Sequence, residues 1–389
     1  MKSPRTFLLV FFLCFAVLLS IHGLINFLTD PFGIFQKYSP DFLEPFKSDR
    51  FLTRVGKAEL SRSGKCRTIL LGASTVEVGL DPDSETWKHK PVCNLGLTAG
   101  NILELEQVLK LSISENPDLK EVVLAADFYA FSDLEDFKHD FAGSAFNPDL
   151  NWFKYYFEAL FAERTARYSY LTLSQYFANA PPLYTPLGFR IGHHNPNTLK
   201  KVLESIELDS KNGGILGSFT YTGKRIEEFK RILSLSCKAT ERSSVVILPS
   251  HALNLEYYRI MGLWETYWKW QKDLVNAWSQ ISEDCKQNVS IWNLNTYDGE
   301  NLISFDDPQN QFYWERVHFK KTMGDRILQI LNGKALGRTS NFSSLQDVEN
   351  LRSKLEKDRA TWLEKDRSIR DFIQEVTKSR TRVGLAQTN

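Results

Sequence analysis

Three side chains that can cooperate in nucleophilic catalysis lie far apart in this sequence. Ser74 follows an apolar run in TILLGASTVEVGL, and the later segment FYWERVHFKKTMGDRIL contains Glu315-x-x-His318. A serine nucleophile needs an imidazole to take its proton and an acid to orient that imidazole. Taken alone, the Ser74 stretch is more typical of a small-residue turn at the end of a strand. The catalytic interpretation therefore depends on whether the fold brings His318 and Glu315 to Ser74.

Short apolar runs alternate with segments of helical periodicity, and this pattern indicates a fold that could bring the three residues together. Short runs rich in strand-forming residues occur at 68–74, 92–98, 121–131, 244–251 and 289–295. Helical patterns occupy 101–116, about 222–241, about 254–285 and 319–332, and Asn101 is a suitable N-cap for the first. This alternation predicts an α/β fold with a parallel sheet covered by helices. Ser74 would then lie at the carboxyl end of a strand, where open α/β sheets bind ligands.

The N-terminus has the composition of a membrane anchor. FLLVFFLCFAVLLSIHGLINFL contains no acidic or basic residue except His22, and it is long enough to span a bilayer. No clear small-x-small cleavage site follows, which favours an uncleaved anchor over a signal peptide. Lys2 and Arg5 precede the span, so the positive-inside rule leaves the N-terminus in the cytoplasm and predicts an extracytoplasmic body.

Charge and cysteine content restrict the remaining choices. The chain has 389 residues with 48 Lys and Arg against 47 Asp and Glu, so no overall field would attract nucleic acid. Cys14 lies in the apolar span. The other cysteines allow two interpretations: disulfides Cys66 to Cys93 and Cys237 to Cys285, or unpaired buried thiols. No cysteine pair has zinc-ligand spacing, and the adjacent His193 and His194 lack a carboxylate partner at ligand spacing, so we expect no metal and no cofactor.

Two segments depart from the alternation of strands and helices. Residues 132–221 are rich in aromatics and prolines and predict a helical and loop-like insertion over the sheet, which either shapes a substrate cleft or only packs. Residues 336–389 carry many charges of both signs with a thin apolar stripe. This pattern predicts one long exposed helix or a pair of helices. The stripe could pack on the body or on another protein, and the pattern favours the alternative of a solvated helix.

An ordered set of short motifs resembles the SGNH or GDSL-like hydrolase superfamily, and more closely its membrane-anchored bacterial members associated with polysaccharide O-acetylation. The motifs span roughly residues 25 to 335. They are Asp30-Pro31-Phe32-Gly33, Gly72-Ala73-Ser74-Thr75, Asn94-Leu95-Gly96-Leu97, Asp127-Phe128, Pro249-Ser250-His251-Ala252 and Trp314-Glu315-Arg316-Val317-His318, followed by Gly324. The resemblance implies a three-layer flavodoxin-like parallel sheet. The expected organisation is an anchor at 1–29, a hydrolase-like domain at 30–335 that contains the 132–221 insertion, and a charged helical extension at 336–389.

The resemblance also implies roles for individual residues. Ser74 would be the nucleophile, His318 the base and Glu315 the acid, although the family usually has Asp there and the longer side chain must still reach the imidazole. The oxyanion hole would use the Ser74 N–H and that of Ala99 or Gly100. The family's Asn after the third strand is not evident. Asp127 and Tyr129 lie near that place, and Tyr129 is the better substitute donor of the two. His251 is either a substrate-contacting residue or a packing and capping residue.

Two functions from different classes follow from these observations. The first is a membrane-anchored, extracytoplasmic serine esterase or O-acyltransferase in the inner membrane, with its body in the periplasm. It would act on an acyl ester of an envelope or exported polysaccharide beside a membrane-bound O-acyltransferase partner. The alternative is an envelope scaffold that keeps the fold with a weak or inactive site, which the Glu315 substitution and the missing Asn favour.

Overall fold

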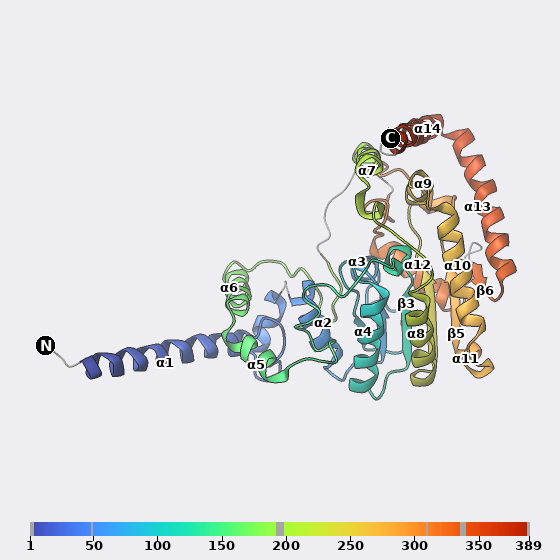
Figure 1. The fold of residues 1–389 in the computed structure, drawn as a ribbon. Helices are drawn as coiled ribbons and strands as arrows, with labels where there is room; N and C mark the ends of the chain where they lie inside the picture. The colour runs from blue at the N-terminus through green and yellow to red at the C-terminus, as the bar shows by residue number, and fades with distance from the viewer. Residues whose placement is uncertain (1–3, 48–49, 192–197, 309, 335–339, 387–389) are drawn as a thin grey trace.

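A mostly parallel six-stranded sheet forms the centre of the body (Figure 1). The computed structural model describes residues 4–47, 50–191, 198–308, 310–334 and 340–386. The strands are β1 (Thr68–Leu71), β2 (Val92–Asn94), β3 (Glu121–Ala125), β4 (Arg242–Ile247), β5 (Val289–Asn293) and β6 (Ser340–Phe342). They lie in the order β2-β1-β3-β4-β5-β6, and only β6 is antiparallel to its neighbour. The predicted α/β fold with a parallel sheet is confirmed.

The strands are apolar on consecutive positions because helices cover both faces of the sheet. In β3, Val122 and Leu124 belong to one core cluster, whereas Val123 and Ala125 belong to another. The first cluster includes side chains of α4 (Ile102–Glu115), α8 (Ile226–Ala239) and α10 (Trp264–Ser279). The second includes side chains of α3 (Ser74–Gly79) and α12 (Lys321–Leu331). Adjacent residues of one strand therefore point into opposite cores.

Local signals explain where several helices begin and end. Asn101 caps α4 by accepting a hydrogen bond from the Glu104 N–H at 3.2 Å, as the sequence predicted. The single helix expected at 254–285 is wrong, because three helices occupy this region: α9 (Ala252–Ile260), α10 and α11 (Glu283–Asn288). Gly262 follows α9 with φ of +73°, a conformation that ends a helix, and Ser282 caps α11.

The helix α1 (Pro4–Thr29) projects from the body as an apolar rod (Figure 1). It is long and apolar enough to cross a membrane. Its C-terminal end packs against α5 (Trp152–Phe161) and α6 (Glu163–Phe177) from the insertion. The following segment contains two short 3-10 helices, η1 (Asp41–Phe46) and η2 (Arg50–Leu52), and leads through α2 (Arg54–Ser61) into the sheet.

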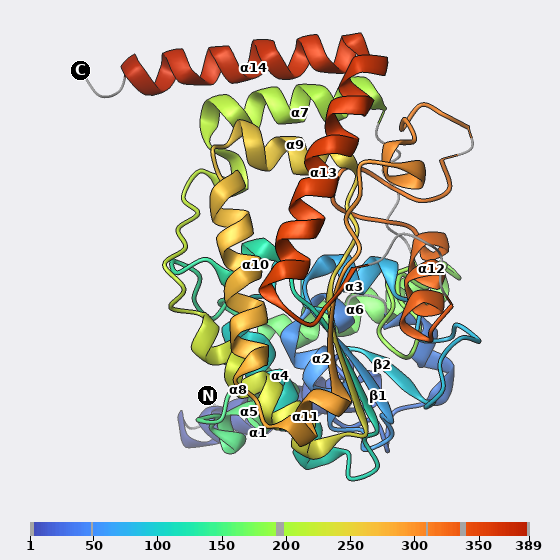
Figure 2. The ribbon, with the colours of Figure 1, turned by 90° about the vertical axis from the view of Figure 1, so that its right-hand side faces the viewer.

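The insertion divides into two parts with different neighbours. Helices α5 and α6 lie beside α1, away from the carboxyl edge of the sheet (Figure 1). The second part contains α7 (Leu199–Asn212) and the 3-10 helix η4 (Gly214–Leu216). Figure 2 shows α7 stacked with α9 and the C-terminal helix α14 (Arg367–Ala386) at the opposite end of the body.

The C-terminal extension packs on the body rather than standing in solvent. Val348, Leu351, Leu355 and Trp362 of α13 (Leu345–Lys365) are buried and belong to the larger core cluster. The preference for a solvated helix is therefore wrong, and the apolar stripe is a packing face. The short strand β6 precedes α13 and extends the sheet beyond β5. The extension thus adds an edge strand and a covering helix to the same fold.

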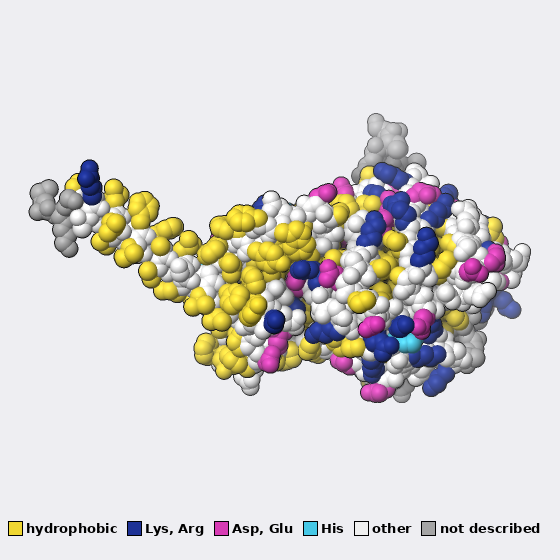
Figure 3. Space-filling model, turned by 90° about the horizontal axis from the view of Figure 1, so that it is seen from below, with side chains coloured by type: hydrophobic (Ala, Val, Ile, Leu, Met, Phe, Trp, Pro, Cys, Tyr) yellow, Lys and Arg dark blue, Asp and Glu magenta, His cyan; other side chains and the backbone are white. Residues whose placement is uncertain are grey.

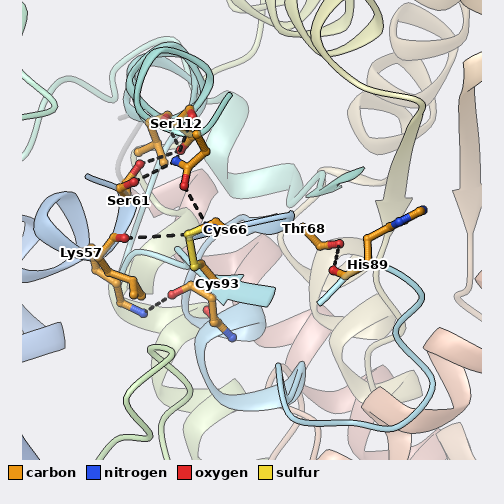
Figure 4. Close-up of a disulfide and its surroundings, with 11 residues drawn as sticks. Lys57, Ser61, Cys66, Thr68, His89, Cys93 and Ser112 are labelled. Carbon is orange, nitrogen blue, oxygen red and sulfur yellow. Dashed lines mark hydrogen bonds between the residues drawn. A yellow bond between two sulfur atoms is a disulfide. The ribbon is translucent and has the colours of Figure 1, made fainter. Parts of the chain in front are cut away.

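Two disulfides connect the cysteines of the body. Cys66 is bonded to Cys93 across the start of the neighbouring strands β1 and β2, and Cys237 is bonded to Cys285 between α8 and α11. Figure 4 shows the first bond near Lys57 and Ser61 of α2 and Ser112 of α4, and both cysteines are buried. The sequence left two disulfides and four unpaired thiols open as alternatives, and the structure has the two disulfides. Cys14 on α1 is free and exposed.

Candidate active site

A continuous chain of hydrogen bonds joins Ser74, His318 and Glu315. The Ser74 Oγ lies 2.8 Å from His318 Nε2, and His318 Nδ1 lies 2.6 Å from Glu315 Oε1. These three residues are separated by as many as 244 positions in the sequence. The arrangement can move a proton from the serine hydroxyl to the imidazole while the carboxylate faces the developing positive charge. The longer Glu side chain therefore reaches the imidazole in this loop.

The loop that carries Glu315 and His318 is closed by its own backbone. Tyr313 and Phe319 form an antiparallel bridge on either side of it, and the Trp314 N–H donates to the His318 carbonyl at 2.9 Å. The Phe319 side chain is fully buried in the core. The Glu315 carboxylate accepts hydrogen bonds from the N–H groups of Val317 and His318 at 3.1 and 2.7 Å. The acid and the base are therefore held by the same tight loop.

The electrostatic setting keeps Glu315 ionised. Burial alone would raise the pKa of the Glu315 carboxyl, but the hydrogen bond and charge of His318 and the two backbone N–H groups lower it below its ordinary value. An ionised carboxylate at this position holds the proton on Nδ1 of the imidazole and leaves Nε2 to accept the serine proton.

Ser74 is the first residue of α3, directly after β1. Gly72 allows the turn, because a Cβ on Gly72 would lie 2.4 Å from Val76 Cγ2 and 2.8 Å from Ala125 Cβ. Asp127, at the end of β3, accepts a hydrogen bond from the Thr75 hydroxyl at 3.0 Å and one from the Ala73 backbone. Burial raises the pKa of Asp127. Asp127 therefore holds the residues on both sides of Ser74, which is a positioning role.

Two other motif residues fix α3 in place. The Asn94 side-chain amide donates to the carbonyls of Val76 and Leu80 at 2.8 and 2.9 Å, which ties α3 to the end of β2. Gly324 lies so close to α3 that a Cβ there would be 1.9 Å from the Gly79 carbonyl oxygen. Glycine at 324 thus permits α12, which follows the His318 loop, to pack directly on the serine helix.

Ser74, Glu315 and His318 line a cavity of about 530 Å³ at the carboxyl edge of the sheet. The chain segments directly after β1, β2 and β3 contribute to its wall, and so does the segment after β5 that carries Glu315 and His318. The remaining wall comes from α7 and η4 of the insertion and from α9. Its lining residues include Ser74, Ala99, Gly100, Phe128, Tyr129, Ser205, Leu216, Asn254, Tyr257, Tyr258, Arg316 and His318. This is the position at which open α/β sheets bind their ligands.

The expected oxyanion donors differ in whether their N–H groups already make a hydrogen bond within the chain. Ala99 and Gly100 both line the cavity, but the Gly100 N–H donates to the Leu97 carbonyl at 2.8 Å. The N–H groups of Ser74 and Ala99 make no hydrogen bond to any residue in the described part of the chain. Ala99 has φ of +51°, a left-handed conformation that is costly for a residue with a Cβ. Of the two alternatives, Ala99 is thus the better candidate and Gly100 is not available.

Tyr129 also lines the cavity, but its hydroxyl is already engaged. The Tyr129 hydroxyl donates to the Glu135 carboxylate, and burial together with this carboxylate raises the pKa of the phenol. A hydroxyl that donates to a nearby carboxylate has no second proton for a substrate oxyanion. In this arrangement Tyr129 does not supply the substitute donor that the sequence suggested.

His251 has a structural role. Its Nδ1 accepts a hydrogen bond from the Leu253 N–H at 3.2 Å, which caps α9, and its Nε2 lies 3.1 Å from the Ile303 carbonyl. The side chain is buried and does not line the cavity. Burial lowers the pKa of His251 to about 4. Of the two interpretations, packing and capping describes this residue, and substrate contact does not.

The sequence reasoning missed the residues of α7 and α9 that shape the cavity. Arg316 lies between the acid and the base in the sequence, donates to Asp209 of α7 at 2.6 Å and stacks on the Tyr257 ring at 3.8 Å. Tyr257, Tyr258 and Asn254 extend from α9 into the cavity wall. The WERVH motif contained the arginine, but no sequence signal indicated its partner on α7.

A buried polar network supports the loop that carries Ala99. The Thr98 hydroxyl donates to Glu77 at 2.9 Å, and Tyr184 donates to the same carboxylate. Lys57 is fully buried nearby and donates to the carbonyls of Asn94 and Gly188 at 2.9 and 2.8 Å, and burial lowers its pKa to about 8. Because Glu77 is one turn after Ser74 on α3, this network couples α3 to the Ala99 loop.

Nothing in the described part of the chain resembles a metal centre. No group of three or more His, Cys, Asp and Glu side chains is arranged to hold a metal ion among the residues described. The pair His193 and His194, which the sequence singled out, lies outside the described residues.

The chain was also compared with known proteins. No protein-family model matches the chain, and a search of curated proteins likewise returned no match. The assignment of an activity must therefore rest on the fold and on the geometry of the cavity.

Proposed function

We propose that this protein is a serine-dependent esterase or O-acyltransferase of the SGNH type. The observation that carries the proposal is the hydrogen-bonded chain Ser74, His318 and Glu315 inside a cavity at the carboxyl edge of the sheet. The strand order β2-β1-β3-β4-β5 supports the flavodoxin-like part of the resemblance. The structural roles of Asn94 and Gly324 support it as well, since both motif residues hold the serine helix.

The proposed reaction proceeds through an acyl-enzyme. Ser74 Oγ attacks the carbonyl carbon of an ester while His318 Nε2 accepts its proton, and Glu315 stabilises the resulting imidazolium. The oxygen of the tetrahedral intermediate lies near the N–H groups of Ser74 and Ala99. The alcohol leaves with the proton from His318. A water molecule or a sugar hydroxyl then gives its proton to His318 and takes the acyl group from Ser74, and His318 returns that proton to the Ser74 oxygen as it leaves.

The cavity favours a carbohydrate as the acyl carrier or acceptor. Phe128, Tyr129, Tyr257 and Tyr258 give it an aromatic lining, and aromatic faces pack well on sugar rings. Its volume of about 530 Å³ exceeds what an acetyl group alone needs. We therefore propose an acylated envelope or exported polysaccharide as substrate, with a membrane-bound O-acyltransferase as partner.

We also propose that the body lies outside the cytoplasm, on a single-pass anchor in the inner membrane. The helix α1 has the length and composition of a span, and Lys2 and Arg5 precede its apolar stretch, which begins at Phe7. The two disulfides of the body are typical of an oxidising compartment such as the periplasm. A reporter that is active only in the cytoplasm should be inactive when fused after Thr29, and an active fusion would place the body in the cytoplasm.

The direct test is turnover of a chromogenic acetyl ester by the full-length protein in detergent. We expect hydrolysis that is lost in Ser74→Ala, with an acetyl adduct on Ser74 in the parent protein. Activity that persists unchanged in Ser74→Ala would overturn the mechanism. Adding an acceptor oligosaccharide then separates the two reactions, because a transferase produces acetylated sugar at the expense of acetate.

One observation favours the alternative, an envelope scaffold with a weak or inactive site. The Gly100 N–H and the Tyr129 hydroxyl already donate to groups of the same chain, so fewer oxyanion donors remain. One missing donor can cost roughly 3 kcal/mol of transition-state stabilisation. Neither turnover nor an adduct on Ser74, in a protein that is folded, would select this alternative.

A further inference from the structure

Exposed aromatic side chains surround the base of α1. We define the aromatic collar as Tyr38, Phe42, Phe153, Phe157 and Phe177, whose exposed fractions are 61, 58, 81, 53 and 81%. A soluble surface seldom leaves several large apolar side chains this exposed in one region. Figure 3 shows the hydrophobic side chains of the α1 rod continuing onto the adjoining end of the body, while Lys, Arg, Asp and Glu are concentrated farther away.

Ring contacts connect three of the collar residues to α1, Tyr38 directly and Phe153 and Phe157 through Phe161. Tyr38 stacks on Phe27 of α1 at 5.6 Å between ring centroids, and Phe153 stacks on Phe157 of the same helix α5 at 6.3 Å. Phe157 in turn contacts Phe161 at 5.1 Å, and Phe161 packs where Gly23 of α1 has no side chain. On α6, Phe177 contacts Tyr176, which packs against Phe42 at 5.3 Å.

Polar contacts show how far along α1 the body reaches. The Asn26 amide donates to the Leu160 carbonyl at 2.7 Å, and the Thr29 hydroxyl donates to Ser169 Oγ at 2.7 Å. Gly23, Asn26 and Thr29 are the buried residues of α1. One face of the last two turns of α1 therefore packs on α5 and α6, while Leu24, Ile25 and Leu28 on the other face remain exposed.

The length of the remaining helix determines where the bilayer must lie. The apolar part of α1 that is free of the body, from Phe7 to His22, rises about 24 Å at 1.5 Å per residue. The hydrocarbon core of a typical bilayer is about 30 Å thick. The part of α1 that is free of the body is therefore about 6 Å shorter than the core, and exposed apolar side chains continue to Leu28 on the part that packs on α5 and α6. Moving the base of α1 into the outer layer of the bilayer supplies the difference, and this also takes the surfaces of α5 and α6 into that layer.

We propose that the aromatic collar is a lipid-binding surface that inserts into the headgroup and acyl-chain boundary around the anchor. Aromatic side chains favour this boundary, and apolar faces of interfacial helices insert by about 5–10 Å, which matches the missing length. This inference depends on α1 spanning a membrane and is independent of the chemistry at Ser74. The body is then fixed to the bilayer at two kinds of contact, the span and the collar.

An orientation of the cavity follows from this placement. Figures 1 and 2 show that α1 runs roughly across the direction of the strands. A membrane perpendicular to α1 therefore lies along the side of the sheet rather than under either end of its strands. The carboxyl edge with Ser74 faces along the membrane surface, where acylated molecules held near the bilayer can approach it.

The test measures the environment of the collar in the full-length protein. Cys14→Ala removes the free thiol, and Phe153→Cys or Phe177→Cys then places a nitroxide label on α5 or at the end of α6. Leu345→Cys is the matched control, since Leu345 is an apolar side chain with 44% exposure at the start of α13. All three positions are exposed, so the substitutions should not disturb the core, and unchanged unfolding temperatures verify this.

The labelled proteins are reconstituted into vesicles of phosphatidylethanolamine and phosphatidylglycerol, and collisions with oxygen and with a water-soluble nickel chelate are compared. Oxygen concentrates in lipid and the chelate stays in water. We expect the ratio of oxygen to nickel collisions to be at least about fivefold higher at 153 and 177 than at 345. Ratios at 153 and 177 within about twofold of the ratio at 345 would overturn the proposal, because purified vesicles contain no other protein that could cover the collar.

Discussion

The loop around His318 and the turn around His251 are two histidine sites that lie close together and differ in what the protein does with the imidazole. The backbone N–H of His251 donates to the Arg316 carbonyl at 3.1 Å, so the two sites are in direct contact. His318 is 21% exposed in its side chain, with a hydroxyl on one nitrogen and a carboxylate on the other. His251 is 3% exposed and has backbone partners on both nitrogens.

The difference shows that partners, rather than residue type or place in the fold, decide the role of a histidine. Both residues follow strands of the same sheet, and both belong to motifs of the same resemblance. A carboxylate partner stabilises the charged imidazolium that catalysis requires, whereas backbone partners in a buried site fix one neutral tautomer. The His251 site is a cap that supports the His318 loop, and the His318 loop can move protons.

The largest expected effect comes from making the same substitution, histidine to glutamine, at each of the two sites. His318→Gln removes the base, and we expect ester turnover to fall by about 10⁴-fold or more. His251→Gln keeps the backbone N–H to Arg316, and we expect turnover within about tenfold of the parent. Initial rates with the chromogenic ester measure both. Equal losses in the two variants would contradict the assignment of different roles.

The next effect concerns the carboxylate that distinguishes the two sites. Glu315→Gln keeps the size of the side chain but removes the charge that stabilises imidazolium, so we expect a loss of roughly 10²- to 10⁴-fold in turnover without unfolding. Glu315→Asp is the matched control, because it retains the charge and restores the residue usual in the resembled family. A Glu315→Gln rate within about twofold of the parent would instead indicate a dyad of Ser74 and His318.

A pH titration of stability probes the burial of His251. Its pKa is lowered to about 4 in the folded protein from 6.5. The unfolded chain therefore binds more protons between these values, and the contribution of His251 is complete above pH 6.5 and is lost as the pH falls toward 4. We expect this group to account for roughly 3 kcal/mol of the free energy of unfolding across that window.

Denaturant unfolding at several pH values gives the measurement. His251→Gln should show a smaller decrease in the free energy of unfolding between pH 6.5 and 4 than the parent, because carboxylates contribute equally to both proteins. Identical slopes for the two proteins would mean that His251 titrates normally and is not buried as described.

The smallest expected effect is at the loop that carries the candidate oxyanion donor. Ala99 has φ of +51°, which costs a residue with a Cβ about 1–2 kcal/mol. Ala99→Gly keeps the N–H and relieves that cost. The greater conformational freedom of glycine in the unfolded chain opposes this gain. We therefore expect the free energy of unfolding to change by about 1 kcal/mol or less. Turnover should stay within about twofold. A large loss of turnover would show that the Ala99 methyl group, and not its N–H, contributes to the cavity.

Much of the fold could be predicted because its signals are local. Each parallel strand contains at least two consecutive apolar residues, and Asn101 is a recognisable cap, so the five parallel strands and α4 follow from the sequence. The strand β6 could not be predicted, because a strand as short as Ser340–Phe342 has no pattern of its own and forms by pairing with β5. The break at Gly262 was missed although a glycine between two helical segments is a recognised stop signal.

The candidate site divides in the same way. Ser74, Glu315 and His318 could be proposed from residue types and order, since each stands next to a strand or helix boundary that the sequence reveals. The state of the oxyanion donors could not, because it depends on hydrogen bonds such as Gly100 to Leu97 and Tyr129 to Glu135. The aromatic wall from α9 and the Arg316 to Asp209 contact also arise only when distant segments pack together.

The most direct test of the central claim is labelling of the folded protein with a fluorophosphonate, which reacts with activated serine hydroxyls. Peptide mass spectrometry should locate a single adduct on Ser74. The adduct should be absent in Ser74→Ala and strongly slowed in His318→Gln, while His251→Gln should label at a rate close to that of the parent. No adduct on Ser74 of the intact protein, or an adduct that forms equally fast in His318→Gln, would contradict the account.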